Sequence, residues 1–446
     1  MLTPQLDLAT PVNLSLAFDA GPCRPKLHGT RQVAEALLIS MLLVAMAFEI
    51  FTLTFTFIFA CLFYPNLQSL VSTMKSTTFI LASLAAFAGR CAAAGVTGSA
   101  PGFAKGTTGG GSAAGAYPKD INQLKTWLTD STPRVILLNK EYNFIGSEGK
   151  VTEKGCRPSS NKCVGKGGQD AINGANWCAG QPSVTVTYDK AGTNAINLGS
   201  NKSIVGVGAN AVIRGKGLRI ANGAKNIIIQ NIHITELNPQ YIWGGDAITL
   251  AGTDLVWIDH VKTSLIGRQH LVTGGAASNR LTVTNNEFDG STSWSATCDN
   301  HHYWAIYFTG ANDQVTFANN YIHHTSGRSP KMTKGTLMHA VNNYWYANSG
   351  HAFDIGAGVS IVAEGNSFYN VKTPILANAG KLFAPSASNS VCKANLGHNC
   401  ERNSLGGSGN FVGTDTIMLS AFKGKSVIAA TAPRTNQALT AGVGKI

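Results

Sequence analysis

The segment Val315-Thr-Phe-Ala-Asn-Asn320 shows the pattern that decides the fold, a short run of β-branched and apolar residues closing on an asparagine pair. The pattern recurs at Leu337-Met-His-Ala-Val-Asn-Asn343 and, with one asparagine, at Ile361-Val-Ala-Glu-Gly-Asn366. The final asparagines of these three segments are 23 residues apart each time. Short strands at a fixed period are typical of a solenoid. About 23 residues suit one coil with three strands and three turns, so the spacing predicts a parallel β-helix.

Similar runs occur earlier in the chain but are separated by longer steps. They are Asn226-Ile-Ile-Ile-Gln-Asn231, Leu255-Val-Trp-Ile-Asp-His260 and Leu281-Thr-Val-Thr-Asn-Asn286. Longer steps predict loops inserted at the turns, and loops on a rigid scaffold are where sites are usually built. An asparagine at the same turn of each coil can bond to the next one through its side-chain amide, forming an asparagine ladder. The alternative fold is a β-sandwich with recurring asparagine turns, which the regular 23-residue step disfavours.

The two ends of the coil region are interpreted separately. Ile121, Leu124, Trp127 and Leu128 lie at helical spacing within Pro118–Asp130, which predicts an amphipathic helix that caps the amino end of the solenoid. Beyond Gly406 the patterning is weak, and the tail is expected to pack along the outside. Residues 95–446 are therefore interpreted as one parallel β-helix domain.

The amino end contains two apolar segments. Residues 74–94 have the order of a secretory signal peptide: Lys75, an apolar run, and small residues up to Ala94. Cleavage near Ala94 would start the mature protein at Gly95 and make it a secreted, extracellular protein. Residues 33–64 are apolar apart from Glu35 and Glu49 and are long enough to span a bilayer. Residues 1–73 are thus interpreted as a mistaken upstream extension of the gene or, alternatively, as a membrane anchor.

The charge composition limits the class of partner. Only 13% of the 446 residues are charged, yet the formal net charge is +12. A basic surface concentrates a polyanion, whether nucleic acid, anionic lipid or an acidic polysaccharide. No nucleic-acid-binding motif accompanies the charge, so nucleic acid is not expected as a partner.

Six cysteines lie beyond the signal segment, and an even number in an exported chain predicts disulfides. They are Cys156, Cys163, Cys178, Cys298, Cys392 and Cys400. Sequence alone leaves several connectivities open. No pair has the CxxC spacing with nearby histidines that a zinc site requires, so no metal is expected there.

Charged residues stand out in three glycine-containing segments of otherwise neutral β-sequence. These are Trp243-Gly-Gly-Asp246, Ile266-Gly-Arg268-Gln-His270 and His324-Thr-Ser-Gly-Arg328-Ser-Pro-Lys331. The steps from 246 to 268 and from 268 to 328 are 22 and 60 residues, about one coil and about two and a half coils. The charged groups are therefore candidates for one face of adjacent coils. The alternative is that they are separate surface salt-bridge partners.

A set of motifs gives the chain a more specific resemblance. They are NIIIQNI at 226–232, WGGDAITL at 243–250, LVWIDHV at 255–261, IGRQH at 266–270, SATCD at 295–299, HHTSGRSPK at 323–331, VNNY at 341–344 and SGHAF-IG at 349–356. In this order, from about Gly95 to the carboxyl end, the chain resembles the fungal pectin lyases of the pectate/pectin lyase superfamily. The resemblance implies an all-β, single-stranded right-handed parallel β-helix. It also implies an endo-acting lyase, active as a monomer, whose partner is methyl-esterified pectin.

The resemblance also implies roles for individual residues. Arg328 matches the arginine that removes the C5 proton of the sugar, and Asp246 matches the retained active-site aspartate. Arg268 matches the arginine that pectin lyases place where pectate lyases bind Ca²⁺, so no cofactor is expected. Lys331 is expected to add positive potential. The segment 257–260 resembles a block that is structural in the superfamily and receives no chemical role.

The chemistry of galacturonan explains this choice of residues. β-Elimination makes an enolate-like carboxyl group at the sugar, which an ionised carboxylate resists unless a metal ion offsets the charge. A methyl ester is neutral, so fixed cations suffice to stabilise the enolate. Thr333 also stands where pectate lyases usually carry a second arginine. The nearest alternative is a calcium-dependent pectate lyase. A second alternative is a hydrolase, which would need a cluster of carboxylates. A third is a β-helix that binds pectin but has no activity.

Arginine is a poor base because its pKa lies above about 12. The proposed role therefore requires that burial and the neighbouring cations Arg268 and Lys331 depress the pKa of Arg328, and it predicts a preference for high pH.

Aromatic rings are expected to stack on the apolar faces of the sugars. The candidates for the cleft are Trp177, Trp243, Tyr303, Trp304 and Tyr307, whereas Trp257 and Trp345 are expected to be core residues. No aromatic residue stands beside Cys156, where pectin lyases often carry tryptophan.

Two further features are interpreted with the family in mind. The family pattern implies the disulfide pairs Cys156–Cys178, Cys163–Cys298 and Cys392–Cys400. Asn201-Lys-Ser is a glycosylation sequon, but it lies in a predicted coil, which disfavours its use.

Overall fold

The computed structural model describes residues 95–163 and 165–446. The expected signal peptide and the alternatives for residues 1–73 fall outside the described residues. None of the helices in the described part is long and apolar enough to cross a membrane.

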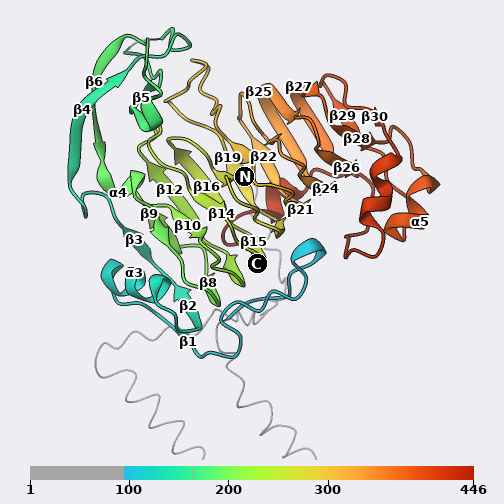
Figure 1. Cartoon of the computed structure of the whole chain (residues 1–446), viewed down its shortest axis with the longest axis horizontal. Coiled ribbons are helices and arrows are strands. Elements are labelled where there is room, and N and C mark those ends of the chain that lie inside the picture. The colour runs from blue at the N-terminus through green and yellow to red at the C-terminus, as the bar shows by residue number, and fades with distance from the viewer. Residues whose placement is uncertain (1–94, 164) are drawn as a thin grey trace, which may run out of the picture. The chain divides into compact units, whose positions relative to one another are not determined.

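The described residues wind into coils that each contribute one strand to three parallel ladders (Figure 1). The first ladder contains β8 (Lys202–Gly206), β11 (Ile227–Gln230), β15 (Val256–Asp259), β18 (Arg280–Thr284), β21 (Gln314–Ala318), β24 (Leu337–Val341) and β26 (Ser360–Glu364). The second contains β9 (Val212–Arg214), β12 (His233–Leu237), β16 (Lys262–Ile266), β19 (Glu287–Asp289) and β22 (Tyr321–His323). The third contains β7 (Ile196–Asn197), β10 (Leu218–Ala221), β14 (Ile248–Ala251), β17 (Leu271–Thr273), β20 (Ile306–Phe308) and β23 (Lys331–Met332). This is the predicted parallel β-helix.

The second and third ladders merge at the later coils. β25 (Tyr344–Ile355) is long enough to pair with β22 through its first residues and with β23 through its last. β27 (Ser367–Asn378) follows β25 in the same way and pairs with it in parallel. Strand pairing from coil to coil covers the backbone edge that each coil would otherwise expose.

The turn between the first and second ladders explains the asparagine pairs. Its first residue has a left-handed backbone, with φ of 57° at Asn231, 53° at Asn285, 56° at Asn319 and 51° at Asn342. Asparagine adopts this conformation at lower cost than most residues. The second residue forms the predicted ladder. The amide donors and acceptors lie 2.9 Å apart between Asn286 and Asn320, 2.9 Å between Asn320 and Asn343, 3.0 Å between Asn343 and Asn366, and 3.0 Å between Asn366 and Asn403.

The interior of the coils is apolar and rich in isoleucine, with aromatic rings in the later coils. Trp345 is fully buried, and its ring stacks on Phe368 with centroids 4.7 Å apart. Trp257 is also buried, but it packs outside the first ladder against Ala100 and Ala104 of the amino-terminal segment. Both tryptophans are therefore packing residues, as predicted.

The predicted helix forms at the start of the solenoid as α3 (Ile121–Thr129), close to β1 (Gly115–Ala116) and β2 (Arg134–Leu138) (Figure 1). Asp120 caps it by accepting a hydrogen bond from the Gln123 N–H at 2.9 Å. Leu124 and Leu128 are fully buried in the main core.

The carboxyl-terminal tail runs back along the row of asparagine turns. Thr431 donates its N–H to Asn342 at 2.9 Å, Gly442 donates to the Asn285 carbonyl at 2.8 Å, and Gly444 donates to Asn231 at 2.6 Å. The tail therefore packs on the outside of the coils, as predicted.

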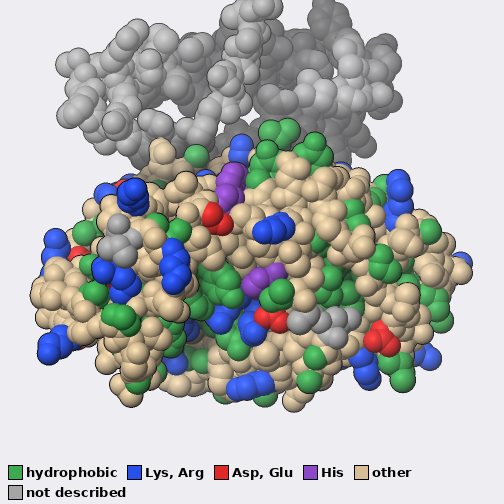
Figure 2. All heavy atoms as spheres, turned by 90° about the horizontal axis from the view of Figure 1, so that it is seen from above, with side chains coloured by type: hydrophobic (Ala, Val, Ile, Leu, Met, Phe, Trp, Pro, Cys, Tyr) green, Lys and Arg blue, Asp and Glu red, His purple; other side chains and the backbone are tan. Residues whose placement is uncertain are grey.

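Basic side chains outnumber acidic ones over the described part of the face seen in Figure 2. This distribution agrees with the positive formal net charge of +12.

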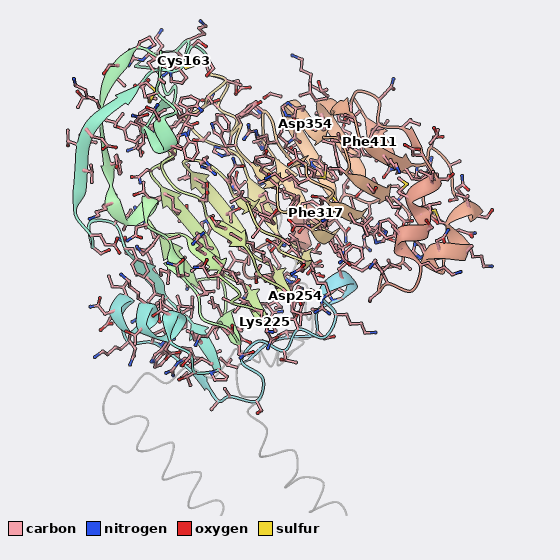
Figure 3. The ribbon with its side chains drawn as sticks, in the orientation of Figure 1. Cys163, Lys225, Asp254, Phe317, Asp354 and Phe411 are labelled. Atoms are coloured by element: carbon pink, nitrogen blue, oxygen red, sulfur yellow. A yellow bond between two sulfur atoms is a disulfide. The ribbon has the colours of Figure 1, made fainter. Side chains whose placement is uncertain are left out.

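An arm that the sequence did not predict projects beside the third ladder. β4 (Lys150–Cys156) and β6 (Ser183–Asp189) pair antiparallel, and β5 (Asp170–Ala171) joins the arm to β13 (Tyr241–Ile242). The disulfide Cys156–Cys178 lies in the arm, and Cys163–Cys298 links the arm to a loop of the coils (Figure 3). The third disulfide is Cys392–Cys400, so all six cysteines pair as the family resemblance implied.

Candidate active site

Three charged residues of the candidate site precede neighbouring strands of the third ladder. Asp246, Arg268 and Arg328 come just before β14, β17 and β23. Parallel strands begin at one edge of a sheet, and the ladder order β14-β17-β20-β23 brings the three side chains to one region. Arg328 therefore lies two coils after Arg268, and the estimate of two and a half coils was wrong, because residues 290–304 enlarge the intervening coil.

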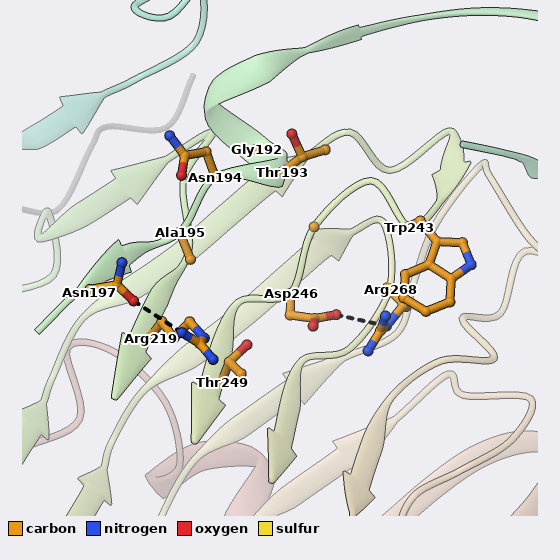
Figure 4. A pocket seen from close by; sticks show the side chains of 11 residues that line it. Gly192, Thr193, Asn194, Ala195, Asn197, Arg219, Trp243, Asp246, Thr249 and Arg268 are labelled. Atoms are coloured by element: carbon orange, nitrogen blue, oxygen red, sulfur yellow. Dashed lines mark hydrogen bonds and ion pairs between the residues drawn. The ribbon is translucent and has the colours of Figure 1, made fainter. Parts of the chain in front are cut away.

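Asp246 and Arg268, which precede the adjacent strands β14 and β17, form an ion pair. Arg268 Nε lies 3.1 Å from Asp246 Oδ1, and the guanidinium carbon lies 4.0 Å from the centre of the Trp243 ring (Figure 4). Asp246 also accepts a hydrogen bond from the Gln269 N–H at 2.9 Å. Burial raises the pKa of Asp246, although Arg268 and the Gln269 N–H favour its ionised form.

Arg328 is held by aromatic rings instead of by a carboxylate. Its guanidinium carbon lies 4.6 Å from the ring centre of Trp304, 5.1 Å from that of Tyr307 and 5.8 Å from that of Tyr303. Among the described residues, no carboxylate lies within 4.0 Å of it. Burial lowers the pKa of Arg328, and the charge of Arg268 acts in the same direction, while Tyr303, Tyr307 and the more distant Asp354 oppose the shift.

The predicted aromatic residues gather around the two arginines. A pocket of about 170 Å³ is lined by Trp177, Trp243, Trp304, Tyr307, Arg268, Gln269, Ile242 and Arg328. Tyr303 does not line this pocket, but its ring packs edge-on against Trp304 with centroids 4.8 Å apart. The buried indole N–H groups of Trp243 and Trp304 find no acceptor among the residues that the structure describes.

Lys331 follows the same segment but is not a free cation. Its ammonium lies 2.7 Å from Asp354 Oδ2, on the next coil of the ladder. The positive potential that Lys331 adds near Arg328 is therefore reduced by this partner.

A second pocket of about 390 Å³ continues from the ion pair along the third ladder (Figure 4). Besides Trp243, Gly245, Asp246 and Arg268, it is lined by residues that sequence reasoning missed: Gly192, Thr193, Asn194, Ala195, Asn197, Arg219 and Thr249. Asn197, Arg219 and Thr249 share one register across β7, β10 and β14. The alternation in Leu218-Arg-Ile220 was a signal that Arg219 points outward, because a strand directs alternate side chains to opposite faces.

Two groups of side chains among the described residues are spaced to hold a metal ion, and neither includes a residue of the candidate site. In the first, His339 and His398 lie 2.8 and 2.9 Å from the same oxygen of Glu364. The second comprises Glu287, Asp289 and His323. There the Lys262 ammonium lies 2.8 Å from Glu287 and 3.2 Å from Asp289. Both carboxylates therefore already form ion pairs with a lysine side chain.

The sequon asparagine is engaged within the coils. Asn201 accepts a hydrogen bond from the Asn226 amide at 2.8 Å, and both Lys202 and Ser203 of the sequon are fully buried. The folded coil therefore hinders access to the Asn201 side chain.

The fold and the site together define a parallel β-helix protein with two adjoining pockets along one ladder, lined by arginines and aromatic rings. The chain belongs to the pectate lyase family of polysaccharide lyases, whose family model matches residues 73–445. It is 57% identical over 365 residues to the probable pectin lyase F of Aspergillus niger, covering 80% of this chain and 76% of that one. It is 54% identical over 376 residues to pectin lyase B of Emericella nidulans, covering 82% of this chain and 98% of that one.

A pectate lyase from Bacillus sp. N165 in complex with trigalacturonate aligns with a TM-score of 0.49 and 19% identity, over 77% of this chain and 98% of that one. The family match and the close relatives confirm the resemblance to fungal pectin lyases that the motifs indicated.

Proposed function

We propose that the protein is an endo-acting, extracellular pectin lyase that cleaves methyl-esterified galacturonan by β-elimination without calcium. The observation that carries this proposal is the environment of Arg328. A half-buried guanidinium that packs on aromatic rings, and has no carboxylate partner among the described residues, is placed to meet a substrate. Its lowered pKa raises the fraction of the neutral form that can act as a base.

In this reaction the neutral form of Arg328 takes the proton from C5 of the sugar. The electron pair of the C5–H bond forms the C4–C5 double bond, the C4–O bond breaks, and the departing oxygen takes up a proton from solvent. Arg268 faces the enolate that develops at the ester carbonyl and stabilises its negative charge. Asp246 orients Arg268 through the 3.1 Å ion pair. Lys331 contributes less positive potential at the enolate, because it forms an ion pair with Asp354.

The donor groups of the site favour a mechanism without calcium. Calcium takes about six to eight oxygen ligands, usually with several carboxylates. Asp246 is the one acidic side chain among the described residues that line the two pockets, and Arg268 is its partner. A calcium-dependent pectate lyase would need further carboxylates at this position, and a hydrolase would need a carboxylate pair.

Two further features support an endo-acting, secreted enzyme. The two pockets share Trp243 and Arg268, so the groove continues past the reacting centre along the ladder, as binding within a long polymer requires. Three disulfides are typical of a protein from an oxidising compartment. A monomer is sufficient, because one chain supplies the whole groove.

Mass spectrometry of early products from highly methylated pectin tests the reaction type. β-Elimination yields internal fragments that carry an unsaturated, methylated sugar at the new non-reducing end, and a range of fragment lengths indicates endo cleavage. Saturated fragments, which contain one more water, would assign hydrolysis and overturn the proposal.

A further inference from the structure

The second pocket contains a cation that the proposed reaction does not use. Arg219 lies on β10, one coil before β14, and lines this pocket together with Asp246 and Thr249 (Figure 4). Its contact within the described chain is a long hydrogen bond of 3.4 Å to Asn197 Oδ1, and no described carboxylate lies within 4.0 Å of it. Asp246, the acidic residue that lines this pocket, already forms an ion pair with Arg268. The pocket therefore holds an arginine whose charge is not compensated.

The remaining lining of this pocket is polar and neutral. Thr193, Asn194, Asn197 and Thr249 offer hydroxyl and amide groups that suit the hydroxyls of a sugar. An acidic sugar would find hydrogen-bonding groups here together with one cation. An arginine guanidinium binds a carboxylate through two parallel hydrogen bonds, whereas a neutral ester lacks the charge that strengthens them.

The position of Arg219 relates this pocket to the reacting centre. Arg219 shares a register with Thr249, Val272 and Tyr307, and Tyr307 contacts Arg328. Adjacent strands of a sheet are about 4.8 Å apart, so this row runs continuously along the groove. A polymer that lies in the groove with one sugar at Arg268 and Arg328 would pass a neighbouring sugar over Arg219.

We propose that Arg219 forms a subsite for the free carboxylate of an unesterified galacturonate that flanks the cleaved ester. This inference rests on the proposed pectin lyase function and deepens it. The enzyme would require a methyl ester at the cleaved sugar and would bind an acid at a neighbouring position.

The test compares Arg219→Gln with the wild-type enzyme on fully methylated pectin and on the same pectin with about half of its esters removed. Loss of one exposed arginine–carboxylate pair should lower kcat/KM about fivefold on the partly de-esterified pectin. It should change the value less than about twofold on the fully methylated one. Arg219→Lys should lose less kcat/KM on the partly de-esterified pectin than Arg219→Gln does, because lysine keeps the charge but loses the paired hydrogen bonds. Arg402→Gln removes the same charge from an exposed position and serves as the control.

An equal loss on both pectins, or no loss on either, would overturn the subsite. Binding of unesterified trigalacturonate, measured by calorimetry, provides a readout that needs no catalysis. Arg219→Gln should weaken that binding relative to both the wild type and Arg402→Gln, and equal affinities or no wild-type binding would also overturn it. A wild-type enzyme that is inactive on both pectins would instead contradict the proposed lyase function, and calorimetry would then decide the subsite alone.

Discussion

At the scale of single residues, the central question is how an arginine can act as a base. Arg328 has a left-handed backbone with φ of 45°, which turns its side chain toward Trp304 and Tyr307. Burial among these rings lowers the pKa of Arg328, and the charge of Arg268 acts in the same direction, although Tyr303, Tyr307 and Asp354 oppose the shift. The shift has the direction that a base requires, because a lower pKa leaves more of the neutral form at a given pH.

Removal of the proposed base should abolish most of the activity. Arg328→Ala is expected to lower kcat on methylated pectin by at least about a hundredfold, the usual contribution of a general base. Arg402→Ala should have no such effect. Initial rates measure the loss, and an unchanged melting temperature shows that the variant folds. A kcat close to that of the wild type would contradict the assignment.

The pH profile tests the same role independently. The wild-type kcat/KM should rise with pH, because the neutral form of Arg328 gains population as the pH approaches its lowered pKa. In Arg328→Lys the rise should begin at lower pH, since lysine has an intrinsically lower pKa than arginine. A profile that does not move in Arg328→Lys would show that another group is the base.

The sequence could single out Asp246, Arg268 and Arg328 because each stands in a specific motif, and the structure brings the three residues into one region. Arg219 could not be singled out in this way, because no motif contains it. Its place in the second pocket depends on the register between β10 and β14. The partner of Lys331 was also missed, because Asp354 lies 23 residues away and only the coil register brings the two together.

At the scale of elements, the asparagine turn is the repeated unit that fixes the register of the coils. Asn343 is fully buried and donates to the Phe317 carbonyl at 2.8 Å and to Asn366 at 3.0 Å. Its oxygen accepts from the backbone and the side chain of Asn320. One side chain therefore satisfies polar groups on the coil before it and on the coil after it.

Asn343→Ala should destabilise the protein by about 2 to 4 kcal/mol, because it leaves several buried donors and acceptors without partners. Asn122→Ala, an exposed helical position, should change the stability by less than about 0.5 kcal/mol. Urea unfolding of both variants measures the difference. Equal stabilities would show that the ladder contributes nothing.

The Glu364 cluster predicts a loss of stability in acid. Burial alone would raise the pKa of Glu364, but hydrogen bonds from His339 and His398 lower it from 4.5 to about 2. Since the folded pKa is depressed, the contribution is complete above pH 4.5 and is lost as the pH falls toward about 2. The free energy of unfolding, measured against pH, should fall in this window by on the order of 3 kcal/mol from this group.

Glu364→Gln should reduce that decrease, while Glu141→Gln, at an exposed position, should leave it unchanged. An identical pH dependence in Glu364→Gln and the wild type would exclude Glu364 as the cause.

The elements differ in how far the sequence could reveal them. The coils were predictable because a 23-residue asparagine spacing repeats, and α3 because its apolar residues have helical spacing. The arm of β4 and β6 has no repeat, and β4 is largely exposed, so its apolar pattern is weak. Residues 290–304 form a loop that no periodicity marks, and this insertion caused the wrong coil count between Arg268 and Arg328.

At the scale of the whole molecule, the net charge of +12 should attract acidic polymers over a long range. Salt screens such attraction, with a Debye length of about 8 Å at physiological ionic strength. The KM for partly de-esterified pectin should therefore rise between about 0.01 and 1 M NaCl, and the KM for fully methylated pectin should stay nearly constant. Initial rates over this range measure both values. The same salt dependence on both substrates would contradict an electrostatic origin.

The measurement that tests the central claim most directly is the initial rate of double-bond formation, followed by ultraviolet absorbance. The substrates are highly methylated pectin and polygalacturonate, each with EDTA and each with added Ca²⁺. We predict a rise on methylated pectin that EDTA does not reduce, and little or none on polygalacturonate. A rise confined to polygalacturonate with Ca²⁺ would contradict the account, since it would make the protein a calcium-dependent pectate lyase and remove the role given to Arg268.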